Sequence, residues 1–308
     1  MLYNAFSLDG DYLMDYTEED YTSESVPEFT KSASLVKGAI PGYFEDMTAK
    51  FQRTNFYGKL RVNPEYGAQH YPIVGTAPDM ALPNVYGTFF YFRTLCLDSI
   101  SDGVTIAFPQ VHIACAVWLN GRFLGRHIGY STHFEIAVPE DALRLGDNEL
   151  CIAVSNHRQL GFADQPVSGI TSRAASEYSG GISDHVELRV YRSPLRAAAV
   201  LTSRDLKTAE VRIEATGPVH FAWEVLDGDT LLLAGEADGD FTFPTEGLSL
   251  WSPDAPKRYT LRLSAGDATL SEEFGLRRLT AEGLSFRLNG APVYLAGVTE
   301  HCYYPLTV

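Results

Sequence analysis

The sequence predicts an all-β protein built from two β-sandwiches. Three observations lead to this fold class: apolar and polar residues alternate with a period of two, segments with a helical period are scarce, and Gly, Asn and Pro separate the alternating segments at short intervals. A chain of 308 residues is also long enough for two domains, each with a core of its own.

The first domain is expected to span residues 1–193. Its clearest strands are short apolar or alternating segments at 88–95, 105–108, 116–119, 134–138, 149–154 and 185–190. Turn signals stand between them at Asn120-Gly121, at Gly125 and in the run from Gly146 to Asn148. Several short strands at this spacing are typical of an antiparallel sandwich.

The second domain is expected to span residues 194–275, because Ser193-Pro194 ends the first series of strands. Its strands are predicted at 210–213, 221–226, 231–233 and 259–263. Asp227-Gly228 and Trp251-Ser252-Pro253 separate them. About 80 residues of short strands suit a smaller sandwich of the immunoglobulin type.

The remaining residues, 276–308, contain a predicted hairpin. A strand that ends at Leu288 is followed by the tight turn Asn289-Gly290 and a second strand, which is predicted to run from Ala291 through Val298. A polar cluster then follows at Thr299, Glu300 and His301. The second strand would therefore deliver polar side chains to its carboxyl end.

The charge of the chain excludes two classes of partner. Its 24 Lys and Arg residues against 39 Asp and Glu give a net charge of -15, and an acidic surface repels nucleic acid and anionic membranes. The first residues lack the basic and apolar regions of a signal peptide, and no apolar stretch approaches the roughly 18 residues of a membrane span. We therefore expect a cytoplasmic protein with no nucleic-acid or membrane partner.

No cofactor or metal is expected. The cysteines, at positions 96, 115, 151 and 302, form no CxxC pair, so we expect reduced, buried side chains. The acidic residues between Asp9 and Asp20 lack the spacing of a calcium loop and are expected to be solvated. His127 and His133 flank a turn without a third ligand, which favours a surface loop over a zinc site.

The residues alone point to no catalytic pair. Glycoside hydrolysis uses two carboxylates across a pocket, and Asn148-Glu149 resembles a dipeptide found at acid/base positions of such enzymes. Its setting after Gly146 and before an apolar strand indicates a turn instead. Among the aromatic residues, Trp118 and Trp223 are predicted in the core, while three loop residues are better placed for ligand contact: Tyr43, Phe44 and Tyr130.

A series of short motifs runs along nearly the whole chain, at 7–12, 40–47, 86–93, 114–121, 129–134, 146–150, 180–186, 250–256, 274–277 and 288–298. The most specific is ACAVWLNG at Ala114 to Gly121. Each motif is weak alone. In this order they resemble the N-terminal half of the glycoside hydrolases of family 2, which include β-galactosidases, β-glucuronidases and β-mannosidases.

The resemblance implies a jelly-roll, sugar-binding-type domain at 1–193, an immunoglobulin-like sandwich at 194–275, and at 276–308 a hairpin with the truncated start of a (β/α)8 barrel. It implies a part of a retaining, β-galactosidase-like enzyme that hydrolyses O-glycosidic bonds in carbohydrate catabolism. The catalytic glutamates of the family lie on later barrel strands, so no catalytic residue is expected here and this chain should be inactive by itself.

The resemblance assigns one site residue. His301 matches a family histidine that borders the sugar pocket, so it is expected to bind substrate, whereas Thr299 and Cys302 depart from the asparagine and the acid usual there. The implied partners are the carbohydrate substrate of the parent enzyme, the missing catalytic barrel and further copies of the chain in a homo-oligomer.

Two other classes of function stay open. An autonomous carbohydrate-binding module would need exposed aromatic residues on one sandwich face or loop end and would bind sugar without a barrel. A purely structural or oligomerising pair of domains would show a large apolar surface with no polar groups converging on a pocket.

Overall fold

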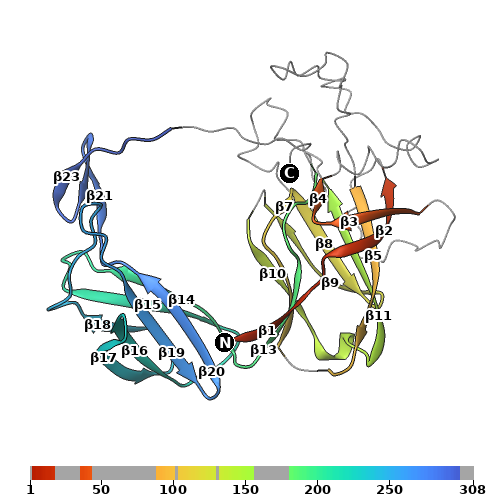
Figure 1. Cartoon of the computed structure of the whole chain (residues 1–308), viewed down its shortest axis with the longest axis horizontal. Helices are drawn as coiled ribbons and strands as arrows, with labels where there is room; N and C mark the ends of the chain where they lie inside the picture. Colours follow the sequence, from red (N-terminus) through yellow and green to blue (C-terminus); the bar gives the residue numbers. More distant parts are fainter. Residues whose placement is uncertain are drawn as a thin grey trace, which may run out of the picture. The chain divides into compact units, whose positions relative to one another are not determined.

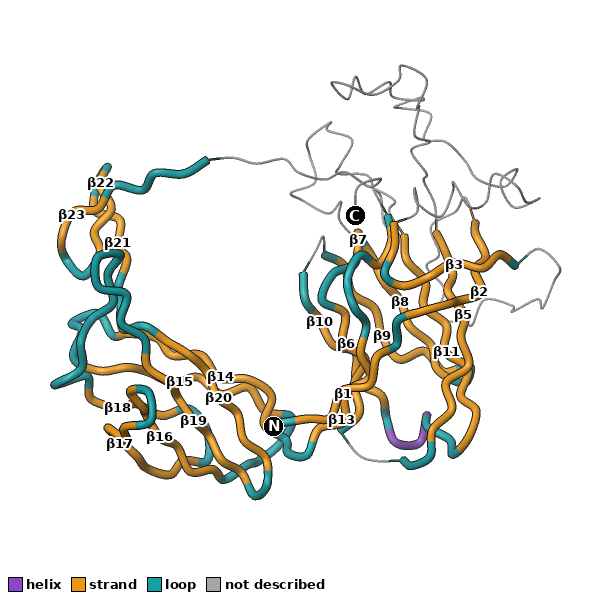
Figure 2. The backbone as a smooth tube through the Cα atoms, viewed as in Figure 1, coloured by secondary structure: helices purple, strands orange, loops and turns teal. Residues whose placement is uncertain are grey.

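The computed structural model describes residues 2–17, 35–43, 88–100, 103–129, 132–155 and 180–298. Nearly every regular element in these ranges is a β-strand, and the single helical element among them is one 3-10 turn at Glu140–Ala142 (Figure 2). The predicted all-β class with β-sandwiches is confirmed. Contacts divide the described residues into two compact units, 5–190 and 191–298 with 2–4; the predicted boundaries at 193 and 275 stay predictions.

The first unit contains a four-stranded, a six-stranded and a small three-stranded sheet (Figure 1). The four-stranded sheet has the order β1 (Tyr3–Ser7), β13 (Glu187–Tyr191), β6 (Val104–Phe108), β10 (Phe134–Val138). The six-stranded sheet has the order β3 (Val36–Ile40), β2 (Gly10–Thr17), β5 (Thr88–Leu97), β11 (Gly146–Ser155), β8 (Ala114–Leu119), β9 (Arg122–Ile128). The small sheet has the order β4 (Gly42–Tyr43), β12 (Gly181–Ile182), β7 (Val111–His112).

The middle of the six-stranded sheet is buried on both faces. All six side chains of β8 are buried, because successive residues of a strand point to opposite faces and each face meets a separate apolar cluster. Val117 belongs to the cluster that includes residues of the four-stranded sheet, whereas Trp118 belongs to an aromatic cluster with Phe90 and Phe92. The prediction that Trp118 lies in the core is confirmed.

The cysteines follow the prediction in part. Cys115 and Cys151 are free and buried in the two clusters of the six-stranded sheet. Cys96 is free but exposed, contrary to the prediction, because its side chain alternates to the open face where β5 pairs with the first residues of β11. Cys302 lies outside the described residues.

The second unit is a sandwich of a three-stranded and a four-stranded sheet. The orders are β14 (Leu195–Thr202), β15 (Thr208–Ala215), β18 (Phe241–Pro244), and β17 (Thr230–Ala237), β16 (Phe221–Asp227), β19 (Tyr259–Ala265), β20 (Ala268–Phe274). Both sheets contribute to one apolar cluster, against which Trp223 packs, as predicted. The Trp223 ring stacks on Phe241 and lies so close to Gly235 that an added Cβ there would come within 2.6 Å of it.

The predicted closing hairpin belongs to a third small sheet with the order β21 (Leu279–Glu282), β22 (Ser285–Leu288), β23 (Ala291–Val293). Asn289 and Gly290 both have positive φ, as a two-residue hairpin turn requires. The prediction that the second strand continues to Val298 is wrong, because β23 ends at Val293, the last residue paired with β22. None of the residues in these three strands is buried.

Candidate functional site

The residue expected to bind substrate, His301, lies outside the described residues, as do Thr299, Glu300 and Cys302. Phe44 and Tyr130, two of the three loop aromatics expected to contact a ligand, also lie outside them. The third, Tyr43, lies on β4, where its ring packs against that of His112 at 5.2 Å. The candidate site within the described residues therefore consists of other side chains.

The structure describes part of the acidic N-terminal run and one of the two histidines predicted on a surface loop. Asp11 and Asp15 lie on β2, where Asp11 is exposed, and the Asp9 carboxylate accepts a hydrogen bond from the Val186 backbone N–H. His127 lies on β9, where its ring stacks on Phe134 at 4.0 Å. The predicted surface loop at His127 is wrong, because the segment after the Asn120-Gly121 turn pairs with β8 as a hairpin that places His127 opposite Cys115.

In the ranges that the structure describes, no three His, Cys, Asp or Glu side chains gather into a group that could hold a metal ion. No helix of that part of the chain has the length and the apolar character needed to cross a bilayer.

A buried histidine lies in the small sheet of the first unit. His112 is fully buried, and its Nε2 is 2.7 Å from the hydroxyl of Ser183, with which it shares a hydrogen bond. Burial lowers the pKa of His112 from 6.5 to about 4, so the imidazole is neutral at pH 7. A neutral imidazole held in this way fixes the three short strands rather than presenting a charge.

This burial predicts a pH dependence of stability. Because the pKa of His112 is lower in the folded chain, the unfolded chain takes up the proton first, and stability is complete above about pH 6.5 and declines as the pH falls towards 4. We expect a loss of about 2–3 kcal/mol between pH 7 and pH 4.5 from this group. Urea unfolding of the native chain and of His112→Gln at both pH values measures it: the variant keeps a polar group for Ser183 but no titration. Equal losses in both proteins would contradict the prediction.

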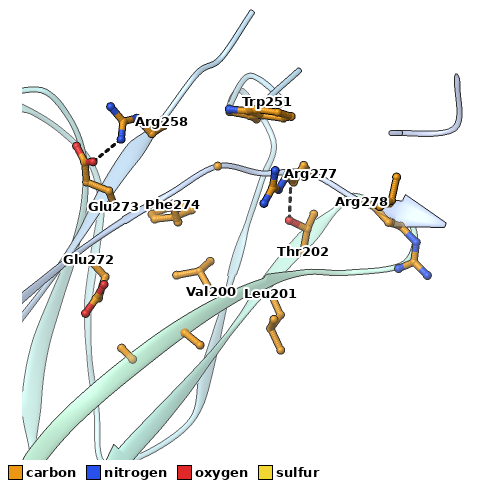
Figure 3. A pocket seen from close by; sticks show the side chains of 14 residues that line it. Val200, Leu201, Thr202, Trp251, Arg258, Glu272, Glu273, Phe274, Arg277 and Arg278 are labelled. Atoms are coloured by element: carbon orange, nitrogen blue, oxygen red, sulfur yellow. Dashed lines mark hydrogen bonds and ion pairs between the residues drawn. The ribbon is translucent and has the colours of Figure 1, made fainter. Parts of the chain in front are cut away.

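The second unit contains an open groove of about 810 Å³ (Figure 3). It lies where β14 and β20, the edge strands of the two sheets, approach one another. Residues 198–202 of β14, the end of β20 and the segment from Gly275 to Leu279 line it, together with Trp251 and Arg258. The small side chains of Ala198 and Ala199 leave room between the two sheet edges.

The carboxylate of Glu272 lies in the wall of this groove. On β20, Ala268, Leu270 and Phe274 are buried, and Glu272 occupies the same side of the strand. It is half-buried, and within the described residues its carboxylate has no hydrogen bond or ion pair. The neighbouring Glu273 points the other way and is paired with Arg258, whose Nη1 lies 2.6 Å from Glu273 Oε2.

The guanidinium of Arg277 lies against the Trp251 ring, and the Arg277 backbone is anchored to Thr202. Its central carbon lies 4.8 Å from the centre of the Trp251 ring, and Figure 3 shows the side chain between that ring and Thr202. The backbone N–H of Arg277 donates to Thr202 Oγ1 at 3.1 Å, and that of Trp251 donates to the Leu276 carbonyl at 2.8 Å. These contacts position the Arg277 side chain at the groove before any ligand arrives.

Sequence reasoning missed these residues as a site. Trp251 and Arg277 both lie in motifs of the family resemblance, at 250–256 and 274–277, and these motifs do not by themselves indicate a site. Their contact joins residues far apart in the chain and depends on the segment after β20 passing beneath the ring. A signal was present in the paired arginines Arg277-Arg278 next to an aromatic motif, in a chain with an excess of acidic residues.

Comparison with known proteins gives a consistent result. No family model matches the sequence. The β-galactosidase large subunit of Leuconostoc lactis is 27% identical over 267 residues, which cover 79% of this chain and 41% of that protein. The chain thus spans less than half the length of this relative.

Solved structures share the fold. The β-glucuronidase of Faecalibacterium prausnitzii matches 95% of this chain and 49% of its own with a TM-score of 0.65 and 23% identity. The β-glucuronidase of Bifidobacterium dentium, solved with coumarin-3-O-glucuronide, matches 95% of this chain and 51% of its own with a TM-score of 0.63 and 21% identity. Each match takes in nearly all of this chain and about half of the other protein.

Proposed function

Because the predicted resemblance to the N-terminal region of the family 2 glycoside hydrolases is confirmed, we propose that this chain is the non-catalytic N-terminal part of a retaining β-glycosidase of the β-galactosidase type. In this proposal, residues 1–193 form the jelly-roll domain and residues 194–275 the immunoglobulin-like domain of a cytoplasmic enzyme of carbohydrate catabolism. The two catalytic carboxylates come from a barrel that follows, so this chain alone hydrolyses no glycoside.

The observation that carries the proposal is the extent of the similarity. It covers 95% of this chain but only about half of the solved β-glucuronidases. In this proposal the glycosidase active site, at the carboxyl ends of barrel strands, belongs to the other half of such a protein. His301, expected at the end of the first barrel strand, would border the sugar pocket of the complete enzyme.

The small sheet β21–β23 supports the presence of a docked partner. Large apolar side chains are exposed on its strands at Leu279 (53%) and Phe286 (46%), and directly beside them at Leu284 (107%) and Tyr294 (89%). A three-stranded sheet without a buried face is not stable by itself, and apolar side chains gathered on it are typical of a surface that another domain covers. We assign that surface to the barrel.

Activity measurements test the proposal directly. We expect the protein continued to its natural stop codon to hydrolyse one of three chromogenic substrates, a β-galactoside, a β-glucuronide or a β-mannoside. The 308-residue chain should be slower by roughly 10⁴-fold or more, because it lacks both the acid and the nucleophile. Hydrolysis by the 308-residue chain at a comparable rate, or no hydrolysis by either protein, would overturn the proposal.

A second candidate, an autonomous carbohydrate-binding module, is favoured by the polar groove of the second unit. It differs from the first in one measurable respect. The 308-residue chain would bind sugar, and a protein that continues beyond residue 308 would show no glycosidase activity. A purely structural pair of domains would neither bind nor hydrolyse, and would use the apolar surface of β21–β23 to associate.

A further inference from the structure

We propose that the groove of the second unit binds a sugar acid, a pyranose that carries a carboxylate as well as hydroxyl groups. The groove presents guanidinium donors at one end, from Arg277 and Arg278, and a carboxylate acceptor in its wall, from Glu272. All of these residues lie in the second unit, so the proposal does not rest on the glycosidase function.

The first argument is the state of the two arginines. In the part of the chain that the structure describes, most arginines meet an oxygen acceptor, as Arg189 does with Glu135, Arg212 with Glu210 and Arg262 with Glu224. The guanidinium groups of Arg277 and Arg278 have no such acceptor within the described residues, although the protein has a net charge of -15.

Two unpaired guanidinium groups on successive residues give the groove a locally positive end. A guanidinium presents a planar fork of donors that matches a carboxylate with two parallel hydrogen bonds. The Trp251 ring holds the Arg277 fork in the groove, so less conformational entropy is lost when an anion binds. The positive end of the groove is therefore suited to a carboxylate.

The second argument is the unpaired carboxylate of Glu272. A half-buried carboxylate is unfavourable unless donors reach it, and sugar hydroxyl groups are such donors. The same carboxylate repels a simple anion, such as acetate, that carries charge but no hydroxyl group. The groove thus favours a ligand that carries an anionic group and hydroxyl donors in the same molecule. Its volume of about 810 Å³ is within the range of ligand sites.

A structural explanation covers only part of these observations. An inward-pointing charge on an edge strand prevents that edge from pairing with another sheet, and this would explain Glu272 on β20. It does not explain why a tryptophan holds one of two unpaired arginines against the same groove. The sugar-acid site accounts for all of these features together.

The test uses the three indole N–H signals of the protein in nitrogen-15 NMR. Trp118, Trp223 and Trp251 are the three tryptophans of the chain, and Trp251 alone borders the groove. Sodium D-glucuronate is titrated up to about 50 mM, well above a low-millimolar dissociation constant, at an ionic strength held constant with sodium chloride. We expect a saturable shift of the Trp251 signal, while the Trp118 and Trp223 signals stay in place and report the fold of each unit.

Two small ligands and four variants decide the outcome. Methyl β-D-glucopyranoside lacks the carboxylate and sodium acetate lacks the hydroxyl groups, and each should bind at least about tenfold more weakly. Arg277→Lys keeps the positive charge but loses the planar pair of guanidinium donors, so it should weaken glucuronate binding about fivefold or more. Arg278→Ala and Glu272→Ala should weaken it by a similar factor. Arg144→Ala, which removes the same charge from an exposed site in the first unit, should change nothing.

Three results would overturn the proposal. One is the absence of any Trp251 shift with glucuronate. Another is an equal shift with acetate, which would mean a contact of charge alone. The last is an equal loss in Arg144→Ala and in the groove variants, which would mean an effect of net charge rather than of this site.

Discussion

Replacement of Asn148 by alanine is expected to lower the free energy of unfolding of the first unit by about 3 kcal/mol or more. Asn148 is fully buried, and its side chain makes four hydrogen bonds. Its Oδ1 accepts from Asn120 Nδ2 at 2.8 Å and from the Arg144 N–H at 2.9 Å, while its Nδ2 donates to the Arg144 and Gly146 carbonyls at 2.7 and 2.9 Å.

The size of this effect follows from what the substitution leaves behind. Alanine removes all four bonds, so that the Arg144 and Gly146 carbonyls, the Arg144 N–H and one N–H of the Asn120 amide lose this partner, at about 1 kcal/mol for each group that water does not reach. The damage reaches the next turn, because Asn120 also donates to the Ala142 carbonyl and accepts from the Glu149 N–H. Asn120 has a φ of 52°, a conformation that these bonds help to hold.

Urea unfolding monitored by Trp118 fluorescence or by hydrogen exchange of β8 and β11 measures this loss. Asn148→Asp distinguishes the contribution of the two donated hydrogen bonds from that of the two accepted ones. It keeps the shape of the side chain and its acceptor oxygen but places a carboxylate oxygen against the two carbonyls. Asp147→Ala, an exposed neighbour in the same strand, should change stability by no more than about 0.5 kcal/mol. If Asn148→Ala were as stable as Asp147→Ala, the hydrogen bonds of the Asn148 side chain would not contribute to stability.

The same residue shows what the sequence could and could not establish. Local composition predicts a turn rather than a catalytic pair at Asn148-Glu149, and in the structure Asn148 is buried among backbone groups while Glu149 is exposed. The predicted turn from Gly146 to Asn148 is wrong in one respect: β11 already begins at Gly146, where it pairs with Leu97 of β5. The pairing of Gly146 with a distant strand sets the start of β11, and the local sequence does not indicate that pairing.

Strands with strong alternation were predicted well and weakly patterned ones were missed. The strand at Phe134–Val138 has the predicted bounds, since its buried and exposed residues alternate throughout. β14, with the sequence LRAAAVLT, was missed because alanine runs do not favour a strand, and it forms through its pairing with β15. β14 is also one wall of the groove, so the site could not be assembled from the sequence.

Replacement of Gly181 by alanine should be comparably damaging, for a steric reason. Gly181 has a φ of 131°, which side-chain-bearing residues rarely adopt, and an added Cβ would lie 2.4 Å from the Gly42 carbonyl oxygen and 2.9 Å from the Tyr43 Cα. Both obstructing atoms belong to the backbone of β4, so neither can move without breaking the pairing of β12 with β4. We expect a loss of about 3 kcal/mol or more in the free energy of unfolding.

The effect of this substitution should reach His112, because Gly181 also pairs with His112 of β7. If the alanine forces the three short strands apart, water reaches the imidazole and its pKa should rise from about 4 towards 6.5. An NMR titration of the His112 ring measures this shift alongside urea unfolding. Gly239→Ala, at a position where an added Cβ meets no atom within 4 Å, is the matched control and should alter neither quantity. An unchanged pKa of His112 in a destabilised Gly181→Ala protein would show that the strands unfold together rather than separate, and would place the buried histidine inside the cooperative core of the first unit.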